Sequence, residues 1–442
     1  MTTTVPTHSR TSRRWPVLVA ASIAFGVIQL DVSVVNVAVR PITAELGGGV
    51  PGGQWVVDAY TVVFAALLLA AGTAGDRLGA RPMVLAGFAV FAVASLGCAV
   101  APNLGLLVAG RAAQGVGGAL LGGCALSLLH HAYPEPAERA RAVGLWAAGA
   151  STTLAGGPVL GGVLTDAFGW RSVFLCTVPV GLAGFALVAR YARPSPRSAA
   201  RLDPLGQVAA VVALTAFAAA VIEAGARGAT DPLVLGLVLV AAPAAAVFAV
   251  RAARDTTLAP LRAPGVRAAM LGGLFVNVGF YGLVFVLGLA FQRRLSPSGA
   301  GLAFVPMMAA IMAGNLVAGR LVRRLGTART VLAGALVMVA GYAVLAVPGT
   351  GYVPLVALGG GLGVLVPAMT ATVLDGVDPS RSGLASGAFT TLRQAGSVLG
   401  VALLGALYAH SGDPRPAVVV AGAATVVVAV LAHQAGRHGG RP

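Results

Sequence analysis

The sequence predicts an all-α membrane protein with about fourteen transmembrane helices. Of its 442 residues, 57% are hydrophobic and only 10% are charged, whereas a soluble domain carries about 25% charged residues. The mean hydropathy is correspondingly high, at +0.87. Apolar runs long enough to cross a bilayer recur in groups of six, two and six. This order predicts two six-helix bundles with two extra central helices between them.

Crossing the hydrocarbon layer takes about 20 apolar residues, and the chain supplies them repeatedly. The first six predicted spans are Pro16–Val39, Gln54–Gly72, Pro82–Ala101, Leu104–Leu129, Ala142–Thr165 and Ser172–Val188. The two extra spans are Leu205–Ile222 and Leu233–Val250. The last six are Ala268–Phe291, Gly299–Val317, Thr330–Val347, Leu355–Leu374, Leu384–Tyr408 and Pro416–Ala432.

These spans divide the chain into bundles, linkers and tails. The predicted regions are an N-terminal tail (1–14), a first bundle (15–190), a linker (191–204), the two extra helices (205–250), a second linker (251–267), a second bundle (268–432) and a C-terminal tail (433–442).

The distribution of arginine sets the predicted orientation. All 30 basic residues are arginines, because lysine is absent. With the N-terminus inside, 22 of them lie in cytoplasmic segments, six lie on the opposite face, and two lie within spans. Cytoplasmic loops of membrane proteins carry such an excess of positive charge. We therefore expect a multi-pass protein of the plasma (inner) membrane with both termini in the cytoplasm.

The composition excludes several classes of function. Without lysine, the chain can hold no Walker A P-loop and no lysine Schiff base. No nucleophile elbow or pair of catalytic carboxylates is visible, and His130 and His131 have no second ligand pair at metal spacing. The arginines are scattered singly and form no basic stripe, which argues against nucleic-acid binding. The sequence thus predicts no enzyme, no cofactor and no metal site, and it leaves the oligomeric state open.

A short polar segment, residues 72–82, is predicted to turn the chain between the second and third spans. Its residues of interest are Gly72, Asp76, Arg77, Gly79 and Arg81. Glycine lets helices approach closely and tolerates a positive φ, and Asp76 is placed to cap the next helix. A weaker copy at 319–326 keeps the glycine at both ends but has arginine where the first has Asp76. The two copies indicate a chain built from two related halves.

Asp31 lies well inside the first predicted span, roughly 24 Å along it from Trp15 at a rise of about 1.5 Å per residue. A charge inside the membrane is costly and needs a physical reason. One interpretation is a carboxylate that faces a central cavity and exchanges protons near neutral pH, because burial favours its protonated form. The other is a structural carboxylate held by hydrogen bonds. We expect the first, with Asp31 as the proton carrier.

Three further charges fall in predicted spans. Arg111 cannot deprotonate, so it must pair with a carboxylate, with carbonyl groups or with water. Arg393, in the thirteenth span, follows the same logic. Asp58 shares a helical face with Gln54 and Thr61. It either lines the outer mouth, where it would attract cationic ligands, or caps its helix at the membrane interface.

The fifth span carries a proline among glycines, at Gly157, Pro158, Gly161 and Gly162. Proline removes a backbone hydrogen bond and kinks a helix. The glycines allow a neighbouring helix to slide close to it.

Taken together, these motifs resemble the major facilitator superfamily, and within it the drug:proton antiporters with fourteen helices. The 72–82 segment is similar to that family's loop between the second and third helices. The other matching residues are Asp31, Asn36 and Pro41 for the first helix, Arg111, Gln114 and Gly115 for the fourth, and Gly157, Pro158, Gly161 and Gly162 for the antiporter motif of the fifth. The resemblance extends over residues 15–408.

The resemblance implies two bundles, with the two extra helices at the periphery, that rock around a cavity between inward-open and outward-open states. It implies a proton-coupled secondary transporter in which Arg111 transfers protons or tunes the carboxylate. The residues expected to act in the conformational switch are Gly72, Asp76, Arg77, Gly79, Arg81, Gly157, Pro158, Gly161 and Gly162.

The predicted substrate cavity is polar but sparsely charged. Its expected residues are Gln29, Asn36, Asp58, Gln114, Asn277, Tyr281 and Arg393. Such a lining suits amphipathic organic molecules, such as drugs or antibiotics, better than sugars or phosphates, which need dense hydrogen-bond partners. The predicted partners are therefore a small-molecule substrate, protons and the lipid bilayer.

Two alternatives stay open. One is a metabolite exporter or a symporter of the same fold. The other is a membrane sensor without transport. A sensor would be expected to tolerate the loss of Asp31 and Arg111 and to carry a sizeable soluble output domain, a feature missing from this sequence.

Overall fold

The computed structural model describes residues 8–194, 203–254, 261–347, 349–377 and 382–438. Within these ranges every regular element is a helix. Thirteen helical segments of the described chain are long and apolar enough to cross a membrane, and α5 (Pro136–Phe168) adds another helix of 33 residues. The prediction of an all-helical membrane protein with about fourteen spans is confirmed.

The helices follow one another in the predicted order. The first bundle contains α1 (His8–Leu46), α2 (Gly49–Leu78), α3 (Ala80–Ala99), α4 (Leu104–Ala132), α5, and the pair α6 (Ser172–Leu175) and α7 (Thr177–Tyr191), which form one span. The extra helices are α8 (Pro204–Arg227) and α9 (Pro232–Arg254). The second bundle contains α10 (Pro264–Phe291), the pair α11 (Pro297–Ala303) and α12 (Val305–Leu325), then α13 (Thr327–Leu345), α14 (Val353–Asp375), α15 (Ser382–Ser411) and α16 (Arg415–His438).

Both predicted tails and both predicted linkers lie partly outside the described residues. These regions are 1–14, 191–204, 251–267 and 433–442. Where they are described, the tails are helical, because α1 begins at His8 and α16 extends to His438.

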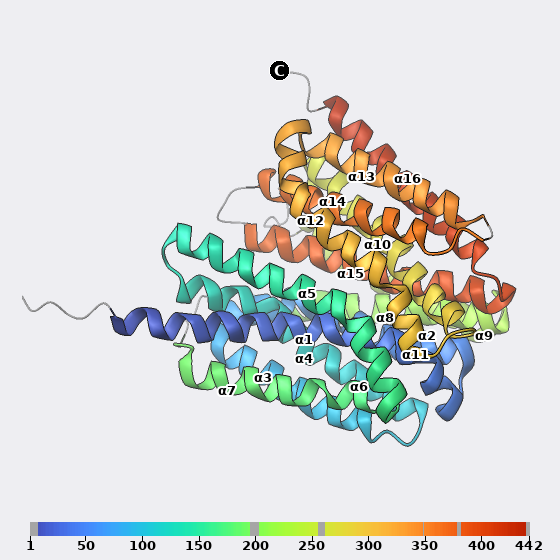
Figure 1. The fold of residues 1–442 in the computed structure, drawn as a ribbon, viewed down its shortest axis with the longest axis horizontal. Coiled ribbons are helices and arrows are strands. Elements are labelled where there is room, and N and C mark those ends of the chain that lie inside the picture. The colour runs from blue at the N-terminus through green and yellow to red at the C-terminus, as the bar shows by residue number, and fades with distance from the viewer. Residues whose placement is uncertain (1–7, 195–202, 255–260, 348, 378–381, 439–442) are drawn as a thin grey trace, which may run out of the picture.

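The two bundles form two lobes, with α1 to α7 in the lower part of Figure 1 and α10 and α12 to α16 above them, while the short α11 reaches down to the first bundle. The extra helix α8 packs against α2 of the first bundle and α15 of the second, and α9 packs on α8. Val62, Ala218 and Val398, one from each of α2, α8 and α15, form a small buried apolar cluster. Small alanine side chains let α8 fit against both bundles, while Leu205, Val208 and Phe217 on the same helix stay exposed.

The 72–82 segment is helical for most of its length. The helix α2 continues to the residue before Gly79, whose φ of 99° is accessible mainly to glycine. The second copy has the same geometry, since α12 runs to the residue before Gly326, which has a φ of 80°. Asp76 is exposed and does not cap α3, because the residue at the N-cap is Gly79. A single glycine therefore turns the chain in each half.

Close packing in the first bundle depends on the glycines of α4. A Cβ at Gly117 would lie 2.7 Å from the backbone nitrogen of Phe91 and 2.9 Å from the carbonyl oxygen of Gly87, both in α3. A Cβ at Gly115 would lie 2.6 Å from the carbonyl oxygen of Tyr60 in α2. Lipid provides no hydrophobic driving force between helices, so close backbone contact must supply the packing energy. These glycines set the distance between α4 and its two neighbours.

The variant Gly117→Ala should destabilise the protein, because the added methyl group would overlap backbone atoms that cannot rotate away. We expect a loss of about 1–3 kcal/mol, measured as a lower Tm of the purified protein in detergent. The matched control is Gly97→Ala in α3, because a Cβ at Gly97 would meet nothing within 4 Å. Equal Tm values for the two variants would contradict this account of the packing.

Candidate functional site

An ion pair lies buried in the middle of the first bundle. Arg111 of α4 donates from Nη1 to Oδ2 of Asp31 in α1. The side chain of Asp31 is 0% exposed and that of Arg111 is 1% exposed. Taking charges out of water costs several kcal/mol per ion, so a buried pair needs further hydrogen bonds to satisfy its remaining donors and acceptors.

A chain of polar side chains supplies those hydrogen bonds. Gln114 accepts from Nη1 of Arg111 at 2.9 Å and donates to Oδ1 of Asp31 at 3.2 Å. Its amide also donates to the hydroxyl of Ser95 in α3 at 2.8 Å. Ser95 accepts in turn from the hydroxyl of Thr177 in α7 at 3.1 Å. Four helices of the first bundle therefore meet in one buried network.

Arg111 has partners that do not depend on Asp31. Its Nε donates to the carbonyl oxygen of Val56 in α2 at 2.8 Å. Its Cζ lies 4.7 Å from the ring centroid of Tyr60 and 5.9 Å from that of Phe174, within the range of a cation–π contact. If Asp31 became neutral, the guanidinium would keep these contacts. Asp31, in contrast, is bound to α4 only through Arg111 and Gln114.

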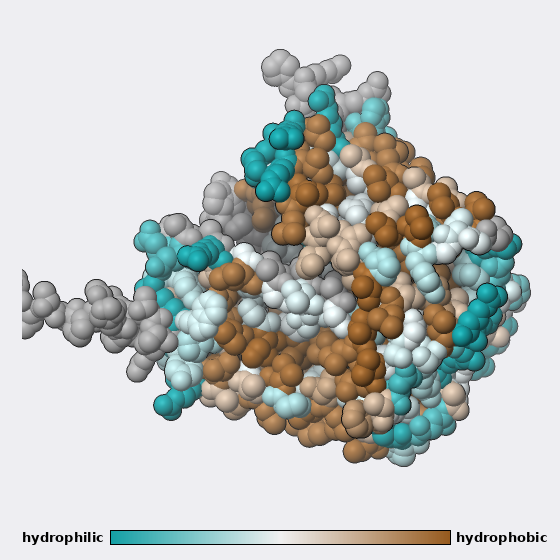
Figure 2. Space-filling view, viewed as in Figure 1, coloured by the Kyte–Doolittle hydropathy of each residue, from teal (hydrophilic) through white to brown (hydrophobic). Residues whose placement is uncertain are grey.

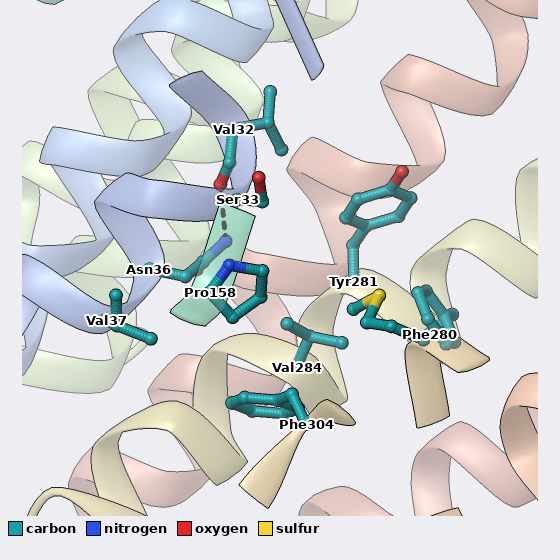
Figure 3. A pocket seen from close by; sticks show the side chains of 10 residues that line it. Val32, Ser33, Asn36, Val37, Pro158, Phe280, Tyr281, Val284 and Phe304 are labelled. Carbon is teal, nitrogen blue, oxygen red and sulfur yellow. Dashed lines mark hydrogen bonds between the residues drawn. The ribbon is translucent and has the colours of Figure 1, made fainter. Parts of the chain in front are cut away.

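A small cavity lies between the two bundles, on the other face of α1. Its lining includes Ser33 and Asn36 of α1, Pro158 of α5 and Tyr281 of α10 (Figure 3). In this conformation it has room for about one water molecule. Ser33 lies about 160° around the helix from Asp31, since successive residues are about 100° apart. The carboxylate expected to face the cavity therefore faces the network around Arg111.

Three of the residues predicted to form the substrate cavity lie at or near it. The amide of Asn36 donates to the carbonyl oxygen of Val32 at 2.8 Å, and its Oδ1 is buried without a partner among the described residues. The ring of Tyr281 stands on the opposite side of the cavity (Figure 3). Gln29 is partly exposed and lies one turn before Ser33, whose hydroxyl donates to the Gln29 carbonyl oxygen at 2.9 Å.

The glycine–proline motif of α5 packs closely on α1. A Cβ at Gly161 would lie 2.8 Å from the Cα of Val34, and one at Gly157 would overlap the side chain of Ser33. Both contacts lie close to the ion pair along α1, because Ser33 and Val34 are only two and three residues beyond Asp31. Only glycine allows α5 to approach α1 so closely.

The same motif also contacts the second bundle. A Cβ at Gly162 would lie 2.5 Å from the carbonyl oxygen of Pro297 in α11. In the reverse direction, a Cβ at Gly301 of α11 would overlap the carbonyl oxygen of Pro158. The two bundles therefore meet here backbone to backbone, with glycine on each side.

Polar contacts close this end of the molecule. Asp166 of α5 accepts from the backbone nitrogen of Ser298 in α11 at 2.9 Å. Gln54 of α2 donates to the carbonyl oxygen of Val401 in α15 at 2.9 Å. From this end the lobes diverge toward the side that carries both ends of the described chain (Figure 1). Figure 2 shows the surface hollowed between them.

A second polar cluster lies in the second bundle. Asn277 of α10 donates to the carbonyl oxygen of Arg393 in α15 at 2.9 Å and to the hydroxyl of Ser397 at 3.1 Å. Nε of Arg393 donates to Oδ1 of Asn277 at 3.4 Å. Arg393 is partly exposed, and no carboxylate of the described residues forms an ion pair with it. It thus differs from Arg111.

Two of the residues predicted for the cavity are buried away from it in this conformation. Gln114 belongs to the network around the ion pair. Asp58 is 0% exposed, and neither of its carboxylate oxygens has a hydrogen-bond partner among the described residues. It lies one turn from Gln54, on the face of α2 that meets α15. Burial without donors disfavours an ionised carboxylate.

The residues of the 72–82 segment are only partly engaged. Arg81 donates to a backbone carbonyl of α7 at 2.7 Å, which ties α3 to α7. Asp76 and Arg77 are exposed, and neither forms an ion pair with a described residue. Gly72 packs against α4, where a Cβ would make an ordinary contact at 3.7 Å.

Sequence reasoning did not identify several residues that complete these sites. Ser95 and Thr177 escaped notice because isolated hydroxyls are common in apolar spans. Gln292, which donates to the carbonyl oxygen of Asn36 across the interface at 3.2 Å, lies one residue beyond the end of a predicted span. The small residues around Gly301 in the sequence could have indicated the close contact of α11 with α5.

Comparisons with known proteins agree with this architecture. A model of the Major Facilitator Superfamily matches residues 21–401. The methylenomycin A resistance protein of Streptomyces coelicolor is 38% identical over 412 residues, which cover 90% of this chain and 86% of the relative. The multidrug resistance protein Stp of Mycobacterium tuberculosis is 33% identical over 406 residues, covering 89% and 75%. The cephamycin export protein CmcT of Amycolatopsis lactamdurans is 35% identical over 418 residues, covering 90% and 85%.

The family match includes the buried ion pair, the glycine–proline motif of α5 and the cluster around Arg393. It runs from α1 into α15 and includes the two helices between the bundles. The chain belongs to the major facilitator superfamily.

Proposed function

We propose that this protein is a proton-coupled secondary transporter that exports amphipathic small molecules, such as drugs or antibiotics, by alternating access. The observation that carries the proposal is the fully buried pair of Asp31 and Arg111, in which the acid can take up a proton while the base stays anchored. The names of relatives, which include antibiotic resistance and export proteins, support the export direction.

The protein is placed in the plasma membrane with both termini in the cytoplasm, as its arginine distribution favours. In this orientation the closed end, where α5 meets α11, faces the outside. The recess between the lobes then opens to the cytoplasm, so this conformation is the one that accepts cargo.

Asp31 is the proton carrier in this proposal. While it is ionised, its attraction to Arg111 holds α1 against α4. Protonation replaces the ion pair by a neutral acid, so α1 is released while Arg111 keeps its contacts to Val56 and Tyr60. The other titratable side chains near Asp31 are Tyr60, Cys98 and Cys176, and none of these residue types is ordinarily charged at neutral pH. Asp31 and Arg111 therefore dominate the local charge.

The ion pair is connected to the closed end through two helix contacts. Ser33 and Val34 of α1 form the surface on which Gly157 and Gly161 of α5 pack. The same part of α5 packs against α11 of the second bundle. A shift of α1 after protonation of Asp31 is therefore passed to α5 and from α5 to the contact between bundles. The coupling follows a continuous series of packed backbones.

The proton gradient supplies enough energy for export. One pH unit is worth about 1.4 kcal/mol, and 100 mV across the membrane adds about 2.3 kcal/mol per charge. One proton driven by both delivers about 3.7 kcal/mol, which would sustain a roughly 500-fold gradient of a neutral cargo.

The variant Asp31→Asn should abolish proton-coupled transport but leave the protein folded, because asparagine mimics the neutral acid and cannot release a proton. Acid-loaded everted vesicles provide the measurement. Adding the neutral probe N-phenyl-1-naphthylamine should trigger proton efflux with the wild-type protein and none above empty vesicles with Asp31→Asn. Asp413→Asn, which changes an acid in the turn before α16, is the control and should behave as wild type. Undiminished proton efflux from Asp31→Asn would remove Asp31 as the carrier.

The variant Arg111→Met should lower the free energy of unfolding by about 3–5 kcal/mol, because it leaves the Asp31 carboxylate buried and unpaired. Adding Asp31→Asn should restore much of this stability, since the double variant buries no charge, although transport stays absent. The Tm values of the purified wild-type protein, Arg111→Met and the double variant test this. A double variant as unstable as Arg111→Met would show that the arginine acts through packing alone.

The variant Gly162→Ala should weaken the closed end, because the methyl group would overlap the backbone of α11. The expected shift toward the outward-open state can be measured with Val37→Cys, a buried cavity position, in a background without native cysteines. An impermeant maleimide added outside should label it severalfold faster in Gly162→Ala. Gly156→Ala is the matched control, since a Cβ there would meet nothing within 4 Å. Equal labelling in the two backgrounds would count against α5 as part of the outer closure.

A further inference from the structure

The charged side chains within the described helical spans differ in their partners. Asp31 and Arg111 neutralise each other, and Asp58 is sealed between α2 and α15. Arg393 is partly exposed and has no ion-pair partner among the described carboxylates. A guanidinium stays charged at any physiological pH, so Arg393 presents a net positive charge to the space around it.

Arg393 contacts α10 on the helix face that also carries a residue of the cavity. A Cβ at Gly273 of α10 would lie 2.9 Å from its Cγ, so the side chain crosses the face of α10. Gly273, Asn277 and Tyr281 are spaced four residues apart and share this face. Tyr281 lines the cavity. At a rise of about 1.5 Å per residue, Arg393 meets α10 roughly 6–12 Å from that ring, on the side toward the recess.

The guanidinium has free donors next to an apolar surface. Its Nε contacts Asn277 at 3.4 Å, whereas neither Nη atom makes a hydrogen bond within the described chain. The ring of Phe389, one turn earlier on α15, lies with its centroid 5.7 Å from Cζ. Two donors in a planar fork match the two oxygens of a carboxylate or sulfonate, and the ring can contact the apolar body that carries such a group.

We propose that Arg393 binds an anionic group of the cargo, so that the preferred cargo molecules are amphipathic organic anions bearing a carboxylate or a sulfonate. This inference rests on the proposed function, because it names the substrate class of the same cavity. It replaces the alternative in which Asp58 lines the outer mouth and attracts cationic ligands. In this conformation Asp58 is fully buried, whereas Arg393 is partly exposed and carries a positive charge.

An anionic cargo also changes the electrical balance of transport. Exporting a monoanion in exchange for any number of protons moves net positive charge inward, whereas one-for-one exchange of a proton for a cation moves none. An inside-negative potential should therefore accelerate export of 8-anilino-1-naphthalenesulfonate from vesicles that contain the protein. Export of this probe that is independent of voltage would contradict the proposal.

The direct test compares two fluorescent probes that share one aromatic skeleton, 8-anilino-1-naphthalenesulfonate and N-phenyl-1-naphthylamine, which lacks the sulfonate. Titration of the purified wild-type protein, corrected for empty micelles, should show that the sulfonate probe binds at least about tenfold more tightly than the neutral probe. Arg393→Gln should remove about this tenfold preference and leave binding of the neutral probe within about twofold. Arg393→Lys keeps the charge and should retain most of the preference.

Arg415→Gln, which changes an exposed arginine of the same bundle, is the matched control and should leave both affinities unchanged. Equal affinity of the wild-type protein for the two probes would overturn the proposal, and so would a parallel loss of both in Arg393→Gln with an unchanged Tm. If Arg393→Gln does not fold, the wild-type protein and Arg393→Lys still decide the outcome. Proton efflux triggered by the neutral probe tests the proposed transport separately, so its presence without a sulfonate preference would reject the anion site alone.

Discussion

The buried ion pair between Asp31 and Arg111 is the interaction on which the rest of the structure depends. Either charge alone would be costly at this depth, and together they tie α1 to α4. The pair is asymmetric, because Arg111 also holds a carbonyl oxygen of α2 and lies against the ring of Tyr60. Asp31 can therefore change its charge without leaving the guanidinium unsupported. In the proposed mechanism, α1 is for the same reason the element that protonation of Asp31 would release.

Glycine determines how far a movement of α1 can spread. Bulky side chains would separate α1, α5 and α11, and each helix could then shift independently. At Gly161 and Gly162 the backbones are in direct contact, and at Gly157 the backbone of α5 meets the side chain of Ser33, so the helices must move together or separate. Closely packed interfaces tend to have discrete arrangements. In the proposed mechanism a single proton would thus bias the closed end, although Asp31 lies on the opposite face of α1 from the cavity.

Much of this arrangement could be predicted from the sequence, because the cost of burying charge and the length of apolar runs are local properties. They indicated the spans, the importance of Asp31 and Arg111, and the close packing around Pro158. Local patterns could not show that Asp31 faces Arg111 and not the cavity, since the two residues are 80 positions apart. Nor could they show that Asp58 is sealed by α15. The sealed acid and the unpaired Arg393 depend on contacts between helices distant in sequence.

The central claim is that protonation of Asp31 releases the closed end of the molecule. It is tested most directly by the distance between spin labels at Phe168 and Val353, exposed positions of separate bundles, measured by double electron–electron resonance across a range of pH. In the wild-type protein, lowering the pH should populate longer distances. In Asp31→Asn the distance distribution should be the same at every pH. A pH-dependent shift that persists in Asp31→Asn would contradict the account.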